Sequence, residues 1–409
     1  MFRRIARAGT TFLNFRPQTR SIISVHRKTT TDLVPTVNLV TTWNTHCGIA
    51  SYSAFLEAEL KERVAVRIIT IPDRFALSPY FFILGVKTGK SKDLVHVQFE
   101  YSKFSDLMLG NTIVGGFSAL PFYLGLAFGS KPVITTYHEI PKSICGFGRF
   151  KRLLDKLVCQ VSDLIIVHNL ESKELMKKLY GLDDSKLKVI PHGCYQTPLF
   201  LNKEECKKKL GLSGKTIIII PGFIRKSKGH DLVLSLIPRL EKNTHLLFAG
   251  EPWTSVDEIY CKKLKAFAKQ NDCSDRVTFT GYISDLSTVL NAADVAILPY
   301  RSVTDSGILH LLVAFGVPTI TSDLEAFKEI QQEYSCIELF QNGDKEDLLA
   351  KINSLLSNCK KRQLLKENCQ KMWNDTKWST IAEKHVRTYI EVLGEHHPSK
   401  SSSMLGKQV

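Results

Sequence analysis

The sequence predicts an α/β protein built from two doubly wound Rossmann-like domains that face each other across a cleft. From about residue 36 onward, short apolar runs alternate with longer helical stretches, and the runs fall into two series. A polar, lysine-rich stretch, LNKEECKKKLGLSGK, separates the series. Strands separated by helical spacers favour parallel sheets covered by helices on both faces, so each series predicts one domain.

The strand candidates of both series are short and rich in Val and Ile, as expected of buried parallel strands. In the first series they cover residues 37–41, 66–71, 94–99, 133–138, 164–169 and 187–192. In the second they cover residues 216–222, 244–250, 276–281, 295–300, 318–323 and 336–340. No fixed-period repeat relates the two series, so the domains share architecture rather than sequence.

Helices are expected at the end of the chain, over residues 345–357, 361–373 and 380–393. The last is amphipathic, with one apolar stripe formed by Ile381, Val386, Tyr389, Ile390 and Leu393. That stripe would either pack back across the cleft or complete the core of one domain.

The segment between Asp106 and Lys131 contains no charged residue and is long enough to span a bilayer. However, it contains several glycines and Pro121, and it lies between two strand candidates. We therefore predict a buried crossover helix here and no transmembrane span.

The composition is that of a globular protein, with 44% hydrophobic and 23% charged residues, which excludes a mostly disordered or fibrous chain. The net charge of +15 points to a polyanionic partner, such as phosphate, nucleic acid or an anionic membrane. About half of that excess lies in residues 1–31, which contain seven basic residues and no acid. Because the remaining body is only mildly basic, no nucleic-acid partner is predicted.

The basic head is compatible with a disordered tail, a mitochondrial transit peptide or a membrane-surface anchor, and it lacks the apolar core of a secretory signal. The ten cysteines have no paired or zinc-like spacing, which favours free thiols in a reducing compartment. We expect a cytoplasmic protein, with peripheral membrane placement and mitochondrial import both left open.

Several nucleotide motifs are absent. A phosphate-loop match over residues 211–216 fails because Lys209 stands where the first glycine belongs, and a strand follows where a helix should. There is no G-x-G-x-x-G in the right place, no pair of aspartates to hold a metal-bound diphosphate, and no hydrolase elbow. No resident cofactor and no metal are predicted.

Three loops that follow strand candidates could bind a phosphate, because ligands of doubly wound folds bind at the carboxyl ends of strands. Gly48 enters a helix after the first strand and would let an anion approach the helix N-terminus, unless it serves the turn alone. Arg225 and Lys228 follow the strand at 216–222 and would grip a diphosphate, unless they form only a solvated basic turn.

The third loop is the turn before the helix ILHLLVAF. Either Asp305 or Ser306 suits the helix N-cap, and the amides of Ser306, Gly307 and Ile308 would then form a small anion-binding nest. We expect this nest to converge with the two basic side chains on one pyrophosphate.

The order of short motifs along the chain resembles that of family 4 glycosyltransferases, which have the GT-B fold. The motifs are CGIA-x-Y, H-x-Q-x-E, TTYHE, IVHN, IPHG, R-x-x-K-G, LLFAGEPW, FTGYISD, AADVAILPY and SGILHLLVAFGVP. The resemblance covers roughly residues 36–395. It implies retaining, metal-independent transfer of a hexosyl group from a nucleotide sugar, such as a UDP- or GDP-hexose, to a sugar, lipid or other hydroxyl acceptor. No protein nucleophile is needed in such a reaction.

The resemblance also implies roles for single residues. Arg225 and Lys228 match the diphosphate-binding pair, and Gly48 matches the glycine beside the diphosphate. His138 matches the active-site histidine near the transferred sugar, although a histidine at a strand end is often a structural hydrogen-bonding group. The remaining matches are Tyr282 and Ile283 in the base loop, Glu329 at a late acidic position in the nucleotide or sugar region, and Glu100, which would face acceptor hydroxyls.

One departure from the family pattern concerns a pair of glutamates seven residues apart. The corresponding positions hold Thr304 and Leu311, so the usual ribose and sugar contacts are missing. We expect Asp305, in the D-S-G turn, to contact the sugar instead.

The expected division of the chain follows from the strand series and the resemblance together. It comprises a head (1–35), an acceptor-side domain (36–195), a nucleotide-sugar-binding domain (196–376), a helix packing back on the first domain (377–395) and a disordered tail (396–409). The identity of the acceptor is left open, and a membrane-associated acceptor is one alternative. A nucleotide-sugar epimerase or hydrolase, and a non-catalytic scaffold, remain alternatives to transfer.

Overall fold

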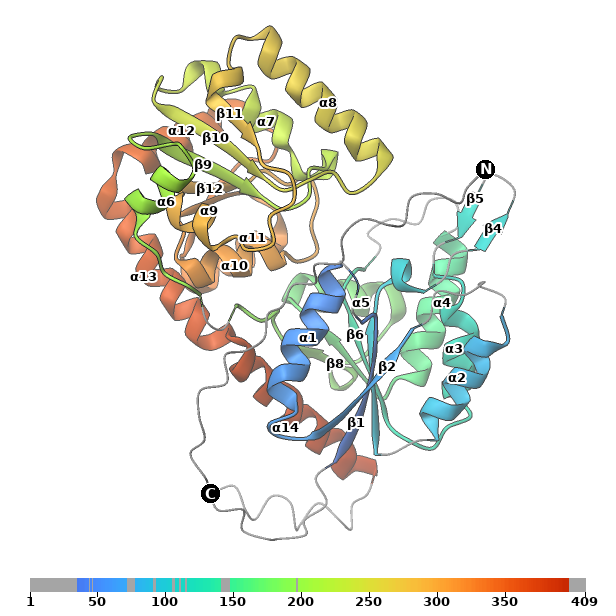
Figure 1. Ribbon diagram of the computed structural model, residues 1–409. Coiled ribbons are helices and arrows are strands. Elements are labelled where there is room, and N and C mark those ends of the chain that lie inside the picture. Colours follow the sequence, from blue (N-terminus) through green and yellow to red (C-terminus); the bar gives the residue numbers. More distant parts are fainter. Residues whose placement is uncertain are drawn as a thin grey trace.

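The architecture was determined from a computed structural model of the full chain. It describes residues 35–396, apart from positions 44, 46, 72–77, 91–92, 105–106, 110–111, 115, 141–147 and 196–197. The expected basic head, apart from its last residue, and nearly all of the expected tail lie outside the described residues. The described part forms two α/β domains, each with its own sheet (Figure 1).

The first domain contains a six-stranded, all-parallel sheet in the order β2-β1-β3-β6-β7-β8. All six strands expected in the first series are present. Their bounds are β1 (Thr36–Thr41), β2 (Ala65–Thr70), β3 (Leu94–Phe99), β6 (Val133–Tyr137), β7 (Leu164–Val167) and β8 (Leu187–Val189). Because β3 is buried along its whole length, its sequence is a continuous apolar run interrupted only by His96 and Gln98.

Helices cover both faces of this sheet (Figure 1). One face is covered by α1 (Gly48–Leu60) and the C-terminal α14 (Trp378–His396). The other is covered by α2 (Tyr80–Gly89), α3 (Ala119–Leu126), α4 (Gly148–Val161) and α5 (Leu170–Tyr180). Ile381 and Tyr389 of α14 lie in one apolar cluster with Tyr52 and Leu56 of α1, so the last helix returns to the first domain.

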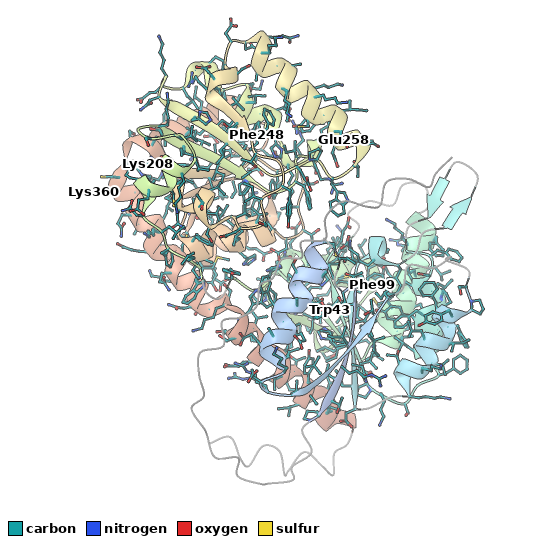
Figure 2. The ribbon with its side chains drawn as sticks, viewed as in Figure 1. Trp43, Phe99, Lys208, Phe248, Glu258 and Lys360 are labelled. Carbon is teal, nitrogen blue, oxygen red and sulfur yellow. The ribbon has the colours of Figure 1, made fainter. Side chains whose placement is uncertain are left out.

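The second domain repeats the plan with a parallel sheet in the order β11-β10-β9-β12-β13-β14. Every strand expected in the second series forms. The strands are β9 (Thr216–Pro221), β10 (Thr244–Ala249), β11 (Val277–Phe279), β12 (Val295–Leu298), β13 (Thr319–Ser322) and β14 (Ile337–Phe340). Phe248 of β10 and Phe99 of β3 are both fully buried, one in the core of each domain (Figure 2).

The helices of the second domain differ in length, and α8 and α13 are the longest. They are α6 (Lys203–Lys209), α7 (His230–Leu234), α8 (Ser255–Gln270), α9 (Ser287–Ala292), α10 (Gly307–Phe315), α11 (Glu325–Tyr334), α12 (Lys345–Ser357) and α13 (Cys359–Thr376). Short 3-10 segments lie at η1 (Tyr101–Lys103), η2 (Asp184–Lys186), η3 (Lys226–Lys228), η4 (Ile237–Arg239) and η5 (Ser274–Arg276). Together α13 and α14 carry the chain from the second domain back to the first (Figure 1).

The predicted buried crossover helix between Asp106 and Lys131 is present as α3, but it occupies only the second half of the segment. An antiparallel hairpin, β4 (Leu107–Leu109) and β5 (Thr112–Val114), comes first, and α3 occupies only eight residues after it. Gly116 adopts a left-handed conformation (φ 75°), which a helix cannot accommodate, and Pro121 is tolerated because it lies in the first turn of α3. Within the described residues, no helix is both long and apolar enough to cross a membrane.

The contact between α2 and α3 depends on four glycines, spaced as G-x-x-x-G on both segments. A Cβ atom on Gly85 would lie 2.1 Å from the Phe122 carbonyl oxygen, and one on Gly125 would lie 2.3 Å from the Phe82 carbonyl oxygen. Gly89 and Gly129 are in similarly close contact. Only glycine permits this approach, so the two helices pack backbone against backbone.

We expect Gly125→Ala to destabilise the protein by about 1–3 kcal/mol, because the added methyl group meets backbone that cannot move without separating α2 from α3. The urea midpoint of unfolding measures the effect. Gly48→Ala is the matched control, since its new Cβ atom meets nothing within 4 Å, and it should change stability by less than about 0.5 kcal/mol. Equal midpoints for the two variants would contradict the packing argument.

Candidate active site

Gly48 lies at the N-terminus of α1, next to Cys47, whose Sγ accepts a hydrogen bond from the Ala50 amide at 3.3 Å. Gly48 does not have a positive φ, and a Cβ atom there would meet nothing within 4 Å. The turn itself therefore does not require glycine. What glycine preserves is open space above the positive end of a helix, which suits an anion.

The loop after β9 is held rigidly against the end of β12. Gly229 adopts φ 69°, and a Cβ atom there would lie 1.9 Å from the Pro299 carbonyl oxygen, so both conformation and space require glycine. The Arg301 amide donates to the Ser227 carbonyl at 2.8 Å. Because of these contacts, the R-x-x-K-G segment has one defined path.

Arg225 and Lys228 project from this loop with partners that leave them accessible. The Nε of Arg225 lies 3.6 Å from an Asp257 carboxylate oxygen, and the Arg225 side chain is about half exposed. The Nζ of Lys228 lies 3.5 Å from the centre of the Tyr300 ring, a cation–π contact. Both cations are therefore oriented before any ligand binds.

The loop after β9 also contacts the start of α10. A Cβ atom on Gly222, which has φ 102°, would lie 3.3 Å from the Ile308 side chain. The two strands that precede these segments, β9 and β12, are neighbours in the sheet. The basic loop and the predicted anion nest are thus side by side, as the sequence led us to expect.

The nest differs from the prediction in its details. The N-cap of α10 is Ser306, whose Oγ accepts from the Leu309 amide at 3.2 Å. The Ser306 amide donates to Oδ1 of Asp305 at 2.7 Å, so it is not available to a ligand. A Cβ atom on Gly307 would lie 3.3 Å from the His192 Nε2, which places the His192 ring against the helix terminus. The amides of Gly307 and Ile308 are those left without helical partners at this end.

Asp305, expected to contact the sugar, forms a buried ion pair with His310 at 3.3 Å. Burial opposes a charge on His310, but the Asp305 carboxylate outweighs it and raises the pKa of His310 to about 10. Burial likewise opposes the Asp305 charge, and His310 holds the pKa of Asp305 below its usual range. Within the described residues, Oδ2 of Asp305 is buried without a hydrogen-bond partner, and a sugar contact by this atom stays a prediction.

His138 is surrounded by other histidines and by Gln98. Its Nε2 lies 2.8 Å from the Gln98 amide, and its Nδ1 lies 3.2 Å from His168 Nε2. Burial lowers the pKa of His138 well below 6.5, and nearby His168 and His192 lower it further. The imidazole is therefore neutral, and a sugar hydroxyl that binds Nε2 has to compete with Gln98.

Hydrogen bonding fixes the tautomers along this chain of side chains. Nδ1 of His168 lies 3.0 Å from the Ile190 carbonyl, so this nitrogen donates. The Nε2 of a neutral His168 then accepts from Nδ1 of His138, and the Nε2 of His138 must itself accept. The structure places Gln98 Oε1 toward His138 Nε2 and the Gln98 NH2 group toward His96 Nε2, so these tautomers require the two ends of the amide to be exchanged. His96 Nδ1 pairs with the Tyr389 hydroxyl at 2.7 Å, so this chain of hydrogen bonds ends in α14.

Glu329 is not placed as expected for a nucleotide or sugar contact. Its carboxylate accepts from the amides of Leu170 at 2.8 Å and Glu171 at 2.6 Å, at the N-terminus of α5 in the other domain. The Asn169 side-chain amide donates to the Thr304 carbonyl at 2.6 Å beside it. The helix terminus attracts the carboxylate, so Glu329 joins the two domains.

Glu100 follows β3, and Glu139, which sequence reasoning missed, follows the neighbouring strand β6. Partial burial raises the pKa of Glu139, the Glu100 carboxylate raises it further, and Lys151 and Arg225 oppose them. Glu139 thus lies between Glu100 and a cation of the second domain. Its position beside His138 in TTYHE was the available signal.

Aromatic side chains at the ends of β9 and β10 were also missed. Phe223 and Trp253 are exposed, and their rings meet edge to face with centres 4.7 Å apart. Tyr282 is exposed after the neighbouring strand β11, whereas Ile283 packs on the apolar core of the second domain. A flat ligand such as a base could stack on this aromatic surface.

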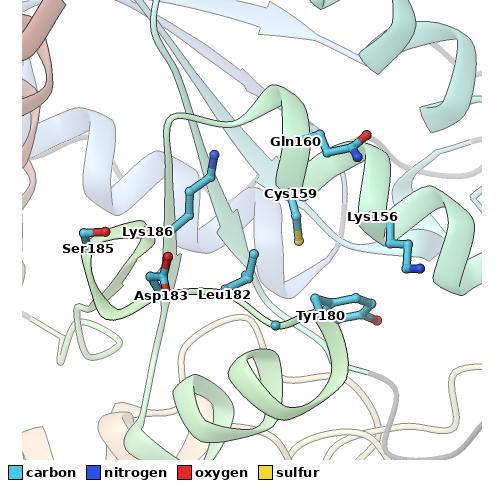
Figure 3. A pocket seen from close by; sticks show the side chains of 9 residues that line it. Lys156, Cys159, Gln160, Tyr180, Leu182, Asp183, Ser185 and Lys186 are labelled. Carbon is cyan, nitrogen blue, oxygen red and sulfur yellow. The ribbon is translucent and has the colours of Figure 1, made fainter.

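A pocket of about 410 Å³ lies elsewhere, between α4 and the connection from α5 to β8 (Figure 3). Lys156, Cys159, Tyr180 and Lys186 line it, and burial raises the pKa of the Cys159 thiol to about 12, so that group is not a reactive thiolate. The pocket contains none of the predicted site residues. It is not the candidate active site.

The ion pair of Asp305 and His310 predicts that the stability of the protein depends on pH. The pKa of His310 is raised from 6.5 to about 10, so its stabilising contribution is complete below pH 6.5 and is lost as the pH rises toward 10. The urea midpoint of the wild type should therefore fall over this pH range. The double variant Asp305→Asn/His310→Gln should lack the part of this fall that comes from His310. His310→Gln alone should cost about 3–5 kcal/mol, because it leaves a buried carboxylate unpaired. Parallel pH profiles for the wild type and the double variant would disprove the pairing.

Comparison with known proteins agrees with this geometry. Residues 202–372 match the family model described as "Glycosyl transferases group 1". The spore coat protein SA of Bacillus subtilis is 27% identical over 199 residues, which cover 46% of this chain and 52% of that protein. The mannosylfructose-phosphate synthase of Agrobacterium fabrum is 26% identical over 216 residues, 49% of this chain and 47% of that protein. The match therefore spans about half the length of these curated relatives.

The fold of the whole described body has close counterparts among solved structures. The HepE protein of Anabaena, solved in complex with UDP, superposes with a TM-score of 0.69 at 14% identity, covering 87% of this chain and 99% of that one. This superposition shows the fold, and the family-model match over residues 202–372 confirms the likeness to glycosyltransferases that the motif order indicated. Residues 202–372 are thus similar to the glycosyl transferases group 1 family, within a chain that has the GT-B fold.

Proposed function

We propose that this chain transfers a hexosyl group from a nucleotide sugar to a hydroxyl acceptor, with retention of configuration and without a metal ion, in the manner of family 4. One observation carries the proposal. The R-x-x-K-G loop, with its two accessible cations, is fixed against the N-terminus of α10 at the ends of two neighbouring strands. This is the arrangement that a diphosphate leaving group requires.

The chemistry assigned to the site concerns the charge that develops on the leaving diphosphate. Arg225 offers a planar fork of donors, Lys228 adds a point charge, and the amides of Gly307 and Ile308 add the positive end of a helix. Cations oriented in advance stabilise that charge without reorganising when the bond breaks. The leaving phosphate then takes the proton of the acceptor hydroxyl on the same face of the sugar, so no protein nucleophile is required.

The donor and acceptor sides of the site follow from the two sheets. The aromatic surface after β9 and β10 lies beside the basic loop and suits the nucleotide base. Glu100 and Glu139 lie at the ends of neighbouring strands of the first sheet and suit acceptor hydroxyls. The UDP bound to HepE makes UDP-sugars the first donors to test.

A second candidate function is nucleotide-sugar binding without turnover. The observation that favours it is the internal pairing of His138 and Glu329, whose polar atoms already have partners in the chain. A binding protein would need Arg225 and Lys228 but not a histidine accessible to the sugar. Turnover separates the two candidates, and analysis of the products distinguishes transfer from hydrolysis.

We expect Arg225→Ala to reduce release of nucleoside diphosphate from the preferred donor by at least about 100-fold, because one of two diphosphate cations is lost. The measurement uses a panel of UDP-, GDP-, ADP- and dTDP-sugars with sugar and lipid acceptors. Arg239→Ala is the matched control, since that exposed arginine pairs with Glu346 on the surface of the second domain. If Arg225→Ala released nucleoside diphosphate as fast as the wild type, the diphosphate would not bind at this loop. If the wild type bound a donor without releasing nucleoside diphosphate, the second candidate would be favoured.

We expect Trp253→Ala to raise the KM for the donor about tenfold and to leave kcat nearly unchanged, because stacking on a base acts equally on ground and transition states. Initial rates over a range of donor concentrations measure the split. Ile259→Ala, an exposed apolar residue of α8, is the control and should match the wild type. A fall in kcat at constant KM would place Trp253 away from the base.

A further inference from the structure

The outer surface of α2 and α3 carries a contiguous group of exposed apolar side chains, named here the apolar patch. It consists of Phe82, Ile83, Leu124 and Phe128. Phe128 is 67% exposed, and its ring meets that of Phe82 edge to face with centres 5.7 Å apart. Leu153, 60% exposed, is a further exposed apolar side chain on α4, which packs beside α3.

The apolar patch is not a by-product of core packing. The core is filled by Phe81, Phe122 and Tyr123, which are fully buried on the inner side of the same helices. The glycine contacts bring α2 and α3 so close that no large side chain fits between them, and the remaining apolar side chains point outward. Single exposed apolar residues are ordinary, but a group of them on adjacent helices marks a contact surface.

The exposed charges on α2, α3 and α4 have one sign. The sequences of α2, α3 and α4 contain five basic residues and one acidic residue. That acidic residue, Asp155, is fully buried and accepts hydrogen bonds from the hydroxyls of Tyr101, Tyr137 and Tyr180. The exposed charges on these helices are therefore cations: Lys87 on α2, with Lys90 as its C-cap, and Arg152 and Lys156 on α4.

The opposite face of the same sheet has the reverse character. The helices that cover it, α1 and α14, contain five acidic and two basic residues. The four helices on the side of the patch, α2 to α5, contain eight basic and three acidic residues, so the first domain is electrically polarised across its sheet, with the apolar patch on the basic side. A surface that combines exposed aromatic side chains with cations and exposes no carboxylate on its helices matches an anionic lipid surface.

We propose that α2, α3 and the start of α4 form a surface that docks on an anionic lipid bilayer. The aromatic and aliphatic side chains of the patch enter the interfacial region, and the flanking lysines and arginine contact lipid head groups. The free energies of apolar burial and of attraction to anionic lipid add, and stable binding needs both contributions. The proposal does not depend on the nature of the reaction.

The first test is co-sedimentation of the full chain with vesicles of phosphatidylcholine alone or of phosphatidylcholine mixed with phosphatidylserine. The wild type should bind the mixed vesicles, and Phe82→Ser/Phe128→Ser should lower the partition coefficient by about tenfold. Phe200→Ser is the matched control, because Phe200 is 61% exposed but belongs to the second domain. Equal binding of the double variant and the wild type, or no binding by the wild type, overturns the proposal.

A second measurement locates the contact, since the basic residues 1–31 could also attract vesicles. Fluorescence of Phe128→Trp should be quenched by brominated phosphatidylcholine in mixed vesicles more strongly than that of the wild type. Phe200→Trp should show no such increase. Equal quenching of both variants overturns the proposal. Release of nucleoside diphosphate in the absence of lipid should be the same for Phe82→Ser/Phe128→Ser and the wild type, which separates this proposal from the proposed function.

Discussion

The relative placement of the two sheets depends on a small number of contacts between the domains, and the buried pair of Asp305 and His310, within the second domain, holds one of the rings that make them. This pair lies at the start of α10, and the His310 ring stacks on that of His192, with centres 4.9 Å apart, in the segment that joins the domains. Removing one partner of a buried ion pair leaves the other charge buried and unpaired, which strongly destabilises the fold. The contact of Glu329 with the N-terminus of α5 supplements it.

This constraint determines the state in which the candidate site is found. Burial lowers the pKa of the histidines near this pair, and the charge on His310 lowers the pKa of His168 and His192 further. These histidines therefore remain uncharged and can form a chain of neutral hydrogen bonds from Tyr389 to Ile190. Among the described residues, the polar groups of this chain are paired with one another, whereas Oδ2 of Asp305 is not. The accessible groups are Arg225 and Lys228, so a donor would first meet the basic loop, and any rearrangement of the domains would have to break the contacts of Glu329.

Local sequence determined most of the architecture. All twelve main strands could be predicted, because a strand buried on both faces is a continuous apolar run that needs no distant partner to be recognised. The loop from Gly222 to Gly229 could also be predicted, since its glycines, its cations and the strand before it are adjacent in the chain. The hairpin of β4 and β5 could not, because an uncharged segment contains the same apolar signal whether it forms strands or a helix.

The tertiary structure alone decided what the polar side chains do. Glu329 contacts amides 158 and 159 residues away. Asp305 and Ser306 were equal N-cap candidates, and the hydrogen bond from the Leu309 amide to Ser306 Oγ decides for Ser306. Trp253, Phe223 and Glu139 belong to the site only because the order of strands places their loops together. The sequence by itself determines which residues are buried in regular elements, because burial leaves a local pattern. Pairing between polar groups leaves none, because it depends on distances that exist only in the folded chain.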